Sequence, residues 1–158
     1  MAERTVVSDE EFEFNAPAFA EEIMSEHKFV THMESEEIYV YEGGVYKNKG
    51  EQIIRARAQE LLESNTTTHR VNEIVEFIRR ATYTPKELFN SPPPNLVCVE
   101  NGILNVETGE LMPHTPDLIF LSKLPVKWDP NAQCPTIVRF LEEVVPDETD
   151  RKLSLIHI

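Results

Sequence analysis

The spacing of the apolar residues changes along this 158-residue chain, and this change restricts the fold class more than any other feature. From about residue 50 to residue 81, apolar side chains recur every three or four positions, which is typical of amphipathic helices. After the prolines at 92–94 they stand in short runs separated by Asn-Gly and Thr-Gly pairs, which is typical of strands and turns. The sequence therefore predicts an α+β domain of short helices and small antiparallel hairpins, not a Rossmann alternation.

The clearest helix is predicted from a single apolar face that ends at residue 81 and consists of Val71, Ile74, Val75, Ile78 and Ala81. A helix over Ala16–Glu26 has Asn15 as its cap, and another begins near Gly50 and ends near Ser64-Asn65. The capping box Thr84-Pro85-Lys86-Glu87 predicts a short helix over Leu88 and Phe89. Pro135 opens a last helix, whose inward face is expected to be Ile137, Phe140, Leu141 and Val144.

Two hairpin regions are predicted. Residues 38–41 and 45–46 are β-rich runs on either side of Gly43-Gly44. Residues 96–99, 103–106 and 111 form strand, turn, strand, turn, strand, and Asn101-Gly102 predicts a type I′ turn because both central residues of that turn need positive φ. Residues 118–128 are expected to be extended.

Composition limits the class of protein. Hydrophobic residues make up 41% of the chain and charged residues 27%, so the chain can bury a core. It has no apolar run long enough for a membrane span, and its acidic N-terminus is not a secretory signal. The two cysteines, Cys98 and Cys134, lie far apart, which favours the reducing cytoplasm and positions in a core and at a helix cap. The expectation is a cytoplasmic protein with no membrane contact.

No catalytic or cofactor motif stands out. The chain lacks GxxxxGK[ST], GxGxxG, HExxH and GxSxG, and the five glycines are too few to build a nucleotide cradle. The histidines are not spaced as metal ligands. We therefore expect no catalytic residue, metal or cofactor within these residues.

The net charge of −13 argues against a general nucleic-acid coat protein, but it is unevenly distributed. Residues 1–44 carry −10, residues 45–86 carry +3 and residues 87–158 carry −6. On two neighbouring helices, the basic residues of the middle could converge on phosphates, and the candidate contacts are Lys47, Lys49, Arg57, Arg70 and Arg79. The alternative is ordinary surface pairing, because Glu51 with Arg55 and Glu76 with Arg80 stand four residues apart.

The last six residues, 153–158, are what a transposase-library sequencing adaptor encodes, so we expect a scar there and exclude it from the fold. The predicted organisation is a loose acidic N-terminus over 1–15, one domain over 16–152 and the scar over 153–158. The chain would then be a fragment of a longer protein.

Three segments together resemble a known family: Val40–Tyr46, Asn101–Asp117 and Leu124–Pro135. Over about residues 37–152 the chain is similar to the N-terminal accessory domain of phage and plasmid primase–helicases, which is related to the collar domain of the poxvirus primase–helicase. The family motif residues present are Gly43, Gly44, Asn101, Gly102, Thr108, Gly109, Pro113, His114, Pro116, Asp129, Pro130 and Pro135.

The resemblance implies a domain that precedes a superfamily 3 helicase core. ATP and magnesium would bind that downstream core, and none of its catalytic residues falls in this chain. The resemblance also implies self-association into a homohexameric ring and weak contact with DNA. Trp128 is expected to anchor packing rather than stack on a base.

Two alternatives remain open. A stand-alone acidic interaction protein, such as a DNA mimic, is favoured by the net charge of −13, whereas the basic middle interrupts the acidic stripe that a mimic needs. A small independent enzyme using scattered carboxylates and His114 has no support from the residue spacing.

Overall fold

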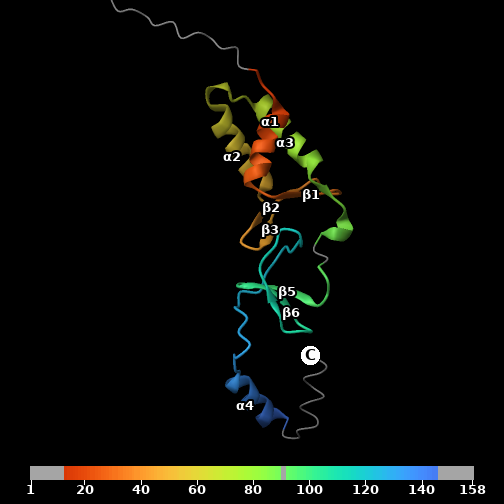
Figure 1. The fold of residues 1–158 in the computed structure, drawn as a ribbon, viewed down its shortest axis with the longest axis vertical. Helices are drawn as coiled ribbons and strands as arrows, with labels where there is room; N and C mark the ends of the chain where they lie inside the picture. Colours follow the sequence, from red (N-terminus) through yellow and green to blue (C-terminus); the bar gives the residue numbers. More distant parts are fainter. Residues whose placement is uncertain (1–12, 90–91, 146–158) are drawn as a thin grey trace, which may run out of the picture. The chain divides into compact units, whose positions relative to one another are not determined.

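The computed structural model describes residues 13–89 and 92–145. The chain divides into two compact units, one through Trp128 and one from Asp129, and each is described by itself (Figure 1). The described residues contain four α-helices and two small sheets, so the α+β prediction is confirmed. The acidic stretch 1–12 and the adaptor-like residues 153–158 lie outside the described residues.

Three helices of the first unit pack side by side: α1 (Ala16–Glu26), α2 (Gly50–Leu62) and α3 (Thr68–Ala81) (Figure 1). The Asn15 side chain caps α1 by accepting the Ala18 N–H at 3.4 Å. Thr67 caps α3 by accepting the Arg70 N–H at 3.3 Å. All three predicted helices are confirmed, and a short 3₁₀ turn, η1 (Glu63–Asn65), links α2 to the cap of α3.

These helices cover one face of a four-stranded sheet whose strand order is β3-β2-β1-β4. The predicted hairpin is β2 (Ile38–Glu42) and β3 (Val45–Lys47). Two strands were not predicted from the sequence: β1 (Phe29–His32), which pairs antiparallel with β2, and β4 (Tyr83–Thr84), which pairs parallel with β1. Their contact is fixed by Thr31, which is fully buried, donates its N–H to the Thr82 carbonyl at 2.8 Å and shares a hydroxyl hydrogen bond with Thr82.

The first core lies between the helices and this sheet. Its fully buried side chains include Ile23 of α1, Ile54 of α2 and Ile74 and Ile78 of α3. Ala81, expected on the same inner face, is exposed because it is the last residue of α3. The apolar periodicity therefore located the buried face, but not its last turn.

The second sheet of the first unit is an antiparallel meander of β5 (Leu96–Val99), β6 (Gly102–Asn105) and β7 (Leu111–Met112). It has its own small core, formed by Val45 of β3 with Cys98, Ile103 and Phe120. The Tyr46 N–H donates to the Phe120 carbonyl at 2.8 Å, so the hairpin β2–β3 joins the two cores. The strands match the prediction over residues 96–112.

The turn between β5 and β6 differs from the prediction. Val99 pairs with Gly102, so Glu100 and Asn101 are the loop residues, and neither has positive φ. The prediction of a type I′ turn centred on Asn101-Gly102 is therefore wrong. Gly102 is required for a different reason: a Cβ there would lie 2.3 Å from the Met112 carbonyl oxygen.

The prediction of a capping box at residues 84–87, with a short helix after it, is also wrong in detail. Thr84 pairs with His32 in the sheet, and its hydroxyl donates to the Thr82 carbonyl at 3.1 Å instead of capping a helix. The turn that follows is a single 3₁₀ turn, η2 (Lys86–Leu88), with Phe89 at its end. Because Thr84 pairs in the sheet, it is not available as the helix cap that the capping box requires.

The second unit contains α4 (Pro135–Val144), with Pro135 in the first turn as predicted. Its apolar face was expected to point inward. Instead Ile137, Phe140 and Val144 are each 59% exposed, and only Leu141 is half-buried. The helix prediction is confirmed, and the prediction for the burial of its face is wrong.

Candidate nucleic-acid interface

Three carboxylates in the first unit each hold two basic side chains. The first is Glu42, the last residue of β2, whose Oε2 lies 2.8 Å from the Lys47 Nζ and 2.7 Å from the Lys49 Nζ. Two ammonium groups therefore converge on one carboxylate oxygen. The hydrogen bonds from Lys47 and Lys49 lower the pKa of Glu42 to about 2, so this carboxyl is ionised throughout the physiological range.

The other two carboxylates join α2 to α3. Glu51 of α2 pairs with Arg55 at 2.8 Å and with Arg79 of α3 at 3.1 Å. Glu76 of α3 pairs with Arg79 and, at 3.8 Å, with Arg80. We call these five basic residues the basic ladder: Lys47, Lys49, Arg55, Arg79 and Arg80, bridged by Glu42, Glu51 and Glu76. Within it, positive groups outnumber negative ones.

Local structure accounts for the ladder. The turn Gly43-Gly44 has φ of +60° and +92°, which glycine adopts without steric cost, and it returns the chain so that residues 47–49 reach Glu42. Lys49 is the residue before α2, and Lys49, Glu51 and Arg55 line one hollow of about 290 Å³. Arg55 also donates to the Asn72 side chain of α3 at 2.8 Å, which ties the two helices together.

Exposure separates the members of the ladder. The side chains of Lys47 and Glu42 are 50% and 48% exposed, and that of Arg80 is 74% exposed. The Arg79 side chain is only 14% exposed and donates to the Glu36 carbonyl as well as to two carboxylates. Arg79 is therefore a structural link between α2, α3 and the turn after β1, whereas the two lysines and Arg80 face solvent.

Two of the five sequence-predicted contacts lie apart from the ladder. Arg57 points to α1, where its Nε donates to Glu26 at 2.8 Å. Its guanidinium also pairs with Glu60 of α2. The pairing with Glu26 raises the pKa of Arg57 and lowers that of Glu26. Arg70, in the first turn of α3, donates to the Asn65 carbonyl at 2.7 Å and lies 5.5 Å from the centre of the Phe14 ring.

The structure thus brings together Lys47, Lys49 and Arg79 but not Arg57 and Arg70. From the sequence, Arg55 and Arg80 were expected among the basic residues that could converge on phosphates and, alternatively, in surface pairs with Glu51 and Glu76, and both pairs form. Sequence reasoning missed the role of Glu42 because the spacing of 42, 47 and 49 matches no helical pattern. The two-glycine turn was the one available signal.

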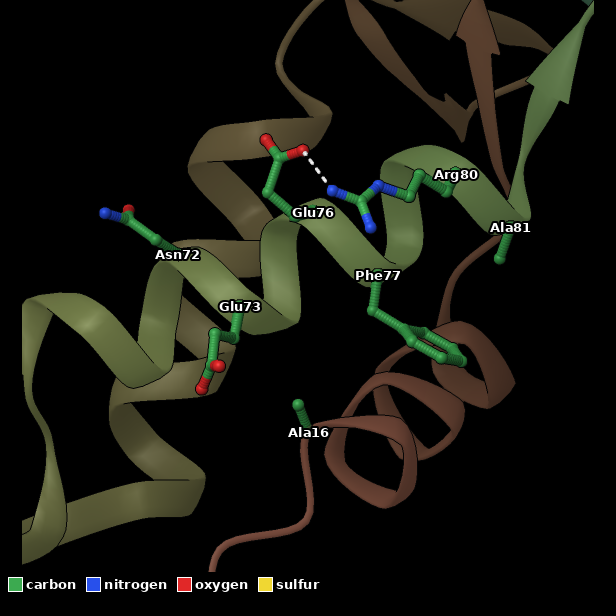
Figure 2. A pocket seen from close by; sticks show the side chains of 7 residues that line it. All are labelled: Ala16, Asn72, Glu73, Glu76, Phe77, Arg80 and Ala81. Carbon is green, nitrogen blue, oxygen red and sulfur yellow. Dashed lines mark ion pairs between the residues drawn. The ribbon is translucent and has the colours of Figure 1, made fainter.

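A groove of about 720 Å³ adjoins the α3 end of the ladder (Figure 2). Figure 2 shows the Phe77 side chain extending from α3 toward α1, with Ala16 near the other side and the Glu76–Arg80 ion pair on the rim. Phe77 also packs against the first core, so its ring has a structural role. The groove combines an apolar wall with charged groups at its edge.

The family motif residues of the first unit lie around the meander. Gly44 is covered by His114, whose ring atom Cδ2 would lie 2.6 Å from a Cβ at position 44, and His114 Nε2 donates to the Val99 carbonyl at 2.9 Å. The Pro116 carbonyl accepts from the Tyr46 hydroxyl at 2.8 Å. These contacts attach the hairpin β2–β3 to the second sheet.

Two further motif positions act through the backbone. The Asn101 side chain donates to the Trp128 carbonyl at 2.9 Å and accepts the Trp128 N–H at 2.8 Å. Gly109 adopts φ +72° and donates its N–H to the Asn105 carbonyl at 2.8 Å, which closes the Thr108-Gly109 turn. Trp128 is half-buried and held at its backbone by Asn101. Pro113 joins β7 to His114.

In the second unit, Asp129 accepts the Asn131 N–H at 2.8 Å and Pro130 follows it in the same turn. Together with Pro135 these residues shape the approach to α4.

A family model described as D5 N terminal like matches residues 16–146. The chain belongs to this family. This family is that of the N-terminal domain of D5-type primase–helicases, which is a replication-related family, and the resemblance seen in the sequence is confirmed. No curated protein matches the sequence.

The D5 N-terminal match begins at α1, earlier than the resemblance at about residue 37 indicated, and ends just beyond α4. The three-helix layer and the basic ladder are therefore part of the family domain. Among residues 13–89 and 92–145, no helix is long and apolar enough to cross a membrane. Within those ranges, no three His, Cys, Asp or Glu side chains are grouped as a metal site.

Proposed function

We propose that this D5 N-terminal-like domain is a non-catalytic accessory domain of an ATP-dependent replicative DNA helicase, where it contacts the DNA backbone and takes part in ring assembly. The observation that carries the DNA part is the basic ladder, in which five basic side chains share three carboxylates. Backbone contacts of this kind are independent of sequence and sensitive to salt. In a ring, symmetry repeats a weak contact in every subunit.

The ladder favours a weak contact over a tight one. Each exposed cation already has a carboxylate partner, so a DNA phosphate must compete with it. A replicative helicase must release DNA as it moves, which a modest, salt-sensitive attraction permits. The excess of acidic residues elsewhere, which gives the chain its net charge of −13, opposes random binding to nucleic acid.

The assembly part rests on α4. Its apolar face is exposed within its own unit, where Ile137, Phe140 and Val144 are each 59% exposed. A second copy of the chain is the partner that ring assembly would supply. Sedimentation velocity over a range of concentrations should show reversible self-association that Phe140→Asp weakens. An unchanged distribution in that variant would remove α4 from the proposal.

The DNA part is tested by the salt dependence of binding to a single-stranded oligothymidylate of about 15 nucleotides. Lys47→Ala/Lys49→Ala should lower the slope of log K against log salt by about 1.4, since each lost phosphate contact on single strands removes about 0.7. The control, Lys86→Ala/Lys127→Ala, removes the same charge outside the ladder and should preserve the slope. Equal slopes for the two double variants would disprove a contact at the ladder.

The proposal that the domain belongs to a helicase is tested by the sequence of its gene. In an untrimmed assembly of the source DNA, the reading frame beyond Lys152 should encode GxxxxGK[ST], followed by an acidic strand and an arginine finger. A natural stop codon beside position 158 would contradict the helicase parent.

The acidic first 44 residues, with a charge of −10, favour one second candidate, an interaction protein that mimics DNA. Such a protein would show no DNA binding at any salt concentration and would bind basic DNA-binding proteins instead. The oligonucleotide titration separates the two functions.

A further inference from the structure

The ion-pair triplet Glu42, Lys47 and Lys49 differs from the other bridged pairs in geometry. Both ammonium groups contact the same atom, Glu42 Oε2, at 2.8 Å and 2.7 Å. At Glu51, in contrast, Arg55 and Arg79 contact different oxygens. The lysine pair is therefore arranged around one anionic oxygen.

This arrangement suits a phosphate oxygen as well as a carboxylate oxygen. Both are anionic acceptors that form short, charge-assisted hydrogen bonds with ammonium groups. Lysine binds phosphate as a point charge and does not require the planar match that arginine provides. With one carboxylate for two lysines, the triplet keeps a net positive charge that attracts an anion.

The site is also open to solvent. The three side chains are 37% to 50% exposed, so the carboxylate can swing away without uncovering a buried charge. At the adjacent turn, a Cβ on Gly43 would have no atom within 4 Å, so there is free space on that side of the Gly43 Cα. The Arg79 side chain, which is only 14% exposed in its pair with Glu51, lacks this freedom.

We propose that Lys47 and Lys49 form a phosphate site for the nucleic-acid backbone and that the Glu42 carboxylate occupies it in the free domain. A backbone phosphate displaces Glu42 from the two ammonium groups, and Glu42 returns when the phosphate leaves. Glu42 thereby holds the affinity down and favours release. The inference rests on the proposed contact between the ladder and DNA, and it assigns the control of that contact to one residue.

The test is the affinity of the 158-residue chain for the same oligothymidylate in Glu42→Gln and in Glu34→Gln. Glu34 is a matched control because its exposed pair with Lys86, at 3.1 Å, lies outside the ladder and its substitution changes the net charge equally. Glu42→Gln should tighten binding several-fold more than Glu34→Gln. Circular dichroism would verify that both variants fold.

The outcomes separate this inference from the proposed function. If the wild-type chain binds with a slope that Lys47→Ala/Lys49→Ala reduces, but the two glutamine variants bind equally, Glu42 does not occupy the site and the inference fails alone. If no variant binds the oligonucleotide, both fail. A larger gain for Glu42→Gln that disappears when Lys47 and Lys49 are also replaced supports both.

A second arm distinguishes backbone phosphate from free phosphate. Inorganic phosphate at the same total phosphate concentration should shift the amide resonances of Gly43 and Gly44 far less than the oligonucleotide does, since only the strand adds neighbouring contacts. Equal shifts would overturn the assignment to a nucleic-acid backbone and leave a site for free phosphate.

Discussion

The two sheets of the first unit are stabilised in different ways. The sheet β3-β2-β1-β4 is covered by three helices, and its core consists mainly of aliphatic side chains. The meander β5-β6-β7 buries far fewer side chains and depends on single close contacts, such as Gly102 beside the Met112 carbonyl and His114 against Gly44 of the β2–β3 turn. The helix-covered sheet requires apolar side chains of suitable volume at regularly spaced positions, whereas the meander requires particular residues at particular positions.

This difference explains why the family motif residues are concentrated in part of the chain. Most of the motif residues lie in or beside the meander, where glycine, asparagine and proline satisfy backbone requirements that few residues can meet. The basic ladder, in contrast, lies on the surface of the hairpin β2–β3 and of α2 and α3, where many surface sequences are compatible with the fold.

The largest effect is expected in the helical core. Ile74→Ala removes a fully buried side chain between α3 and the sheet, and should cost about 4 kcal/mol of unfolding free energy because a cavity remains. Urea denaturation measures the loss. Met33→Ala, at an exposed position, is the control and should cost under about 0.5 kcal/mol. A loss of less than about 1 kcal/mol at Ile74 would show that this core is not the main source of stability.

In the meander, adding one carbon should have a comparable effect. Gly102→Ala places a Cβ 2.3 Å from the Met112 carbonyl oxygen and should cost about 2–3 kcal/mol, because β6 and β7 must separate. Gly109→Ala, where nothing lies within 4 Å of the added carbon, bears only the cost of φ +72°, about 1 kcal/mol. Equal losses in the two variants would mean that the close contact is unimportant.

A smaller effect is expected at the Asn101–Trp128 contact. Asn101→Ala removes two side-chain hydrogen bonds to the Trp128 backbone and should cost about 1 kcal/mol, with faster amide exchange at Trp128. Asn48→Ala, which removes one exposed bond to Glu37, should leave that exchange rate unchanged. No change at Trp128 in either variant would show that Asn101 does not hold this segment.

The helical part of the fold could be predicted from the sequence because each helix has an apolar face, and α1 and α3 also begin at a capping side chain, Asn15 and Thr67. The strands β1 and β4 could not, since they are short and contain Thr31, His32 and Thr84. Thr31 is buried only because Thr82, distant in sequence, supplies its hydrogen-bond partner. In the same pair of strands, Thr84 pairs with His32, so it does not have its expected capping role.

For the candidate site, the sequence identified the basic segment but not its geometry. Helical spacing revealed the Glu51–Arg55 and Glu76–Arg80 pairs. It could not show that Arg57 points to α1 or that Arg79 crosses to α2, because these directions depend on how the helices pack. The junction of Glu42 with two lysines depends on the path of the chain after a turn.

The smallest effect concerns pH. Glu42 has a pKa of about 2 in the folded chain against an ordinary value of 4.5, so its ion pairs stabilise the fold fully above pH 4.5 and lose that effect as pH falls through about 2. A carboxyl carbon NMR titration should place the Glu42 midpoint near 2, and Lys47→Ala/Lys49→Ala should return it toward 4.5. A midpoint near 4.5 in the wild-type chain would mean that the triplet does not form in solution.

The most direct test of the central claim is an amide NMR titration of the 158-residue chain with single-stranded oligothymidylate at low salt. The account predicts the largest shifts over residues 42–50 and at Arg55 and Arg80, with little change around Arg57 and Arg70. Shifts absent from the ladder, or concentrated at Arg57 and Arg70, would contradict it.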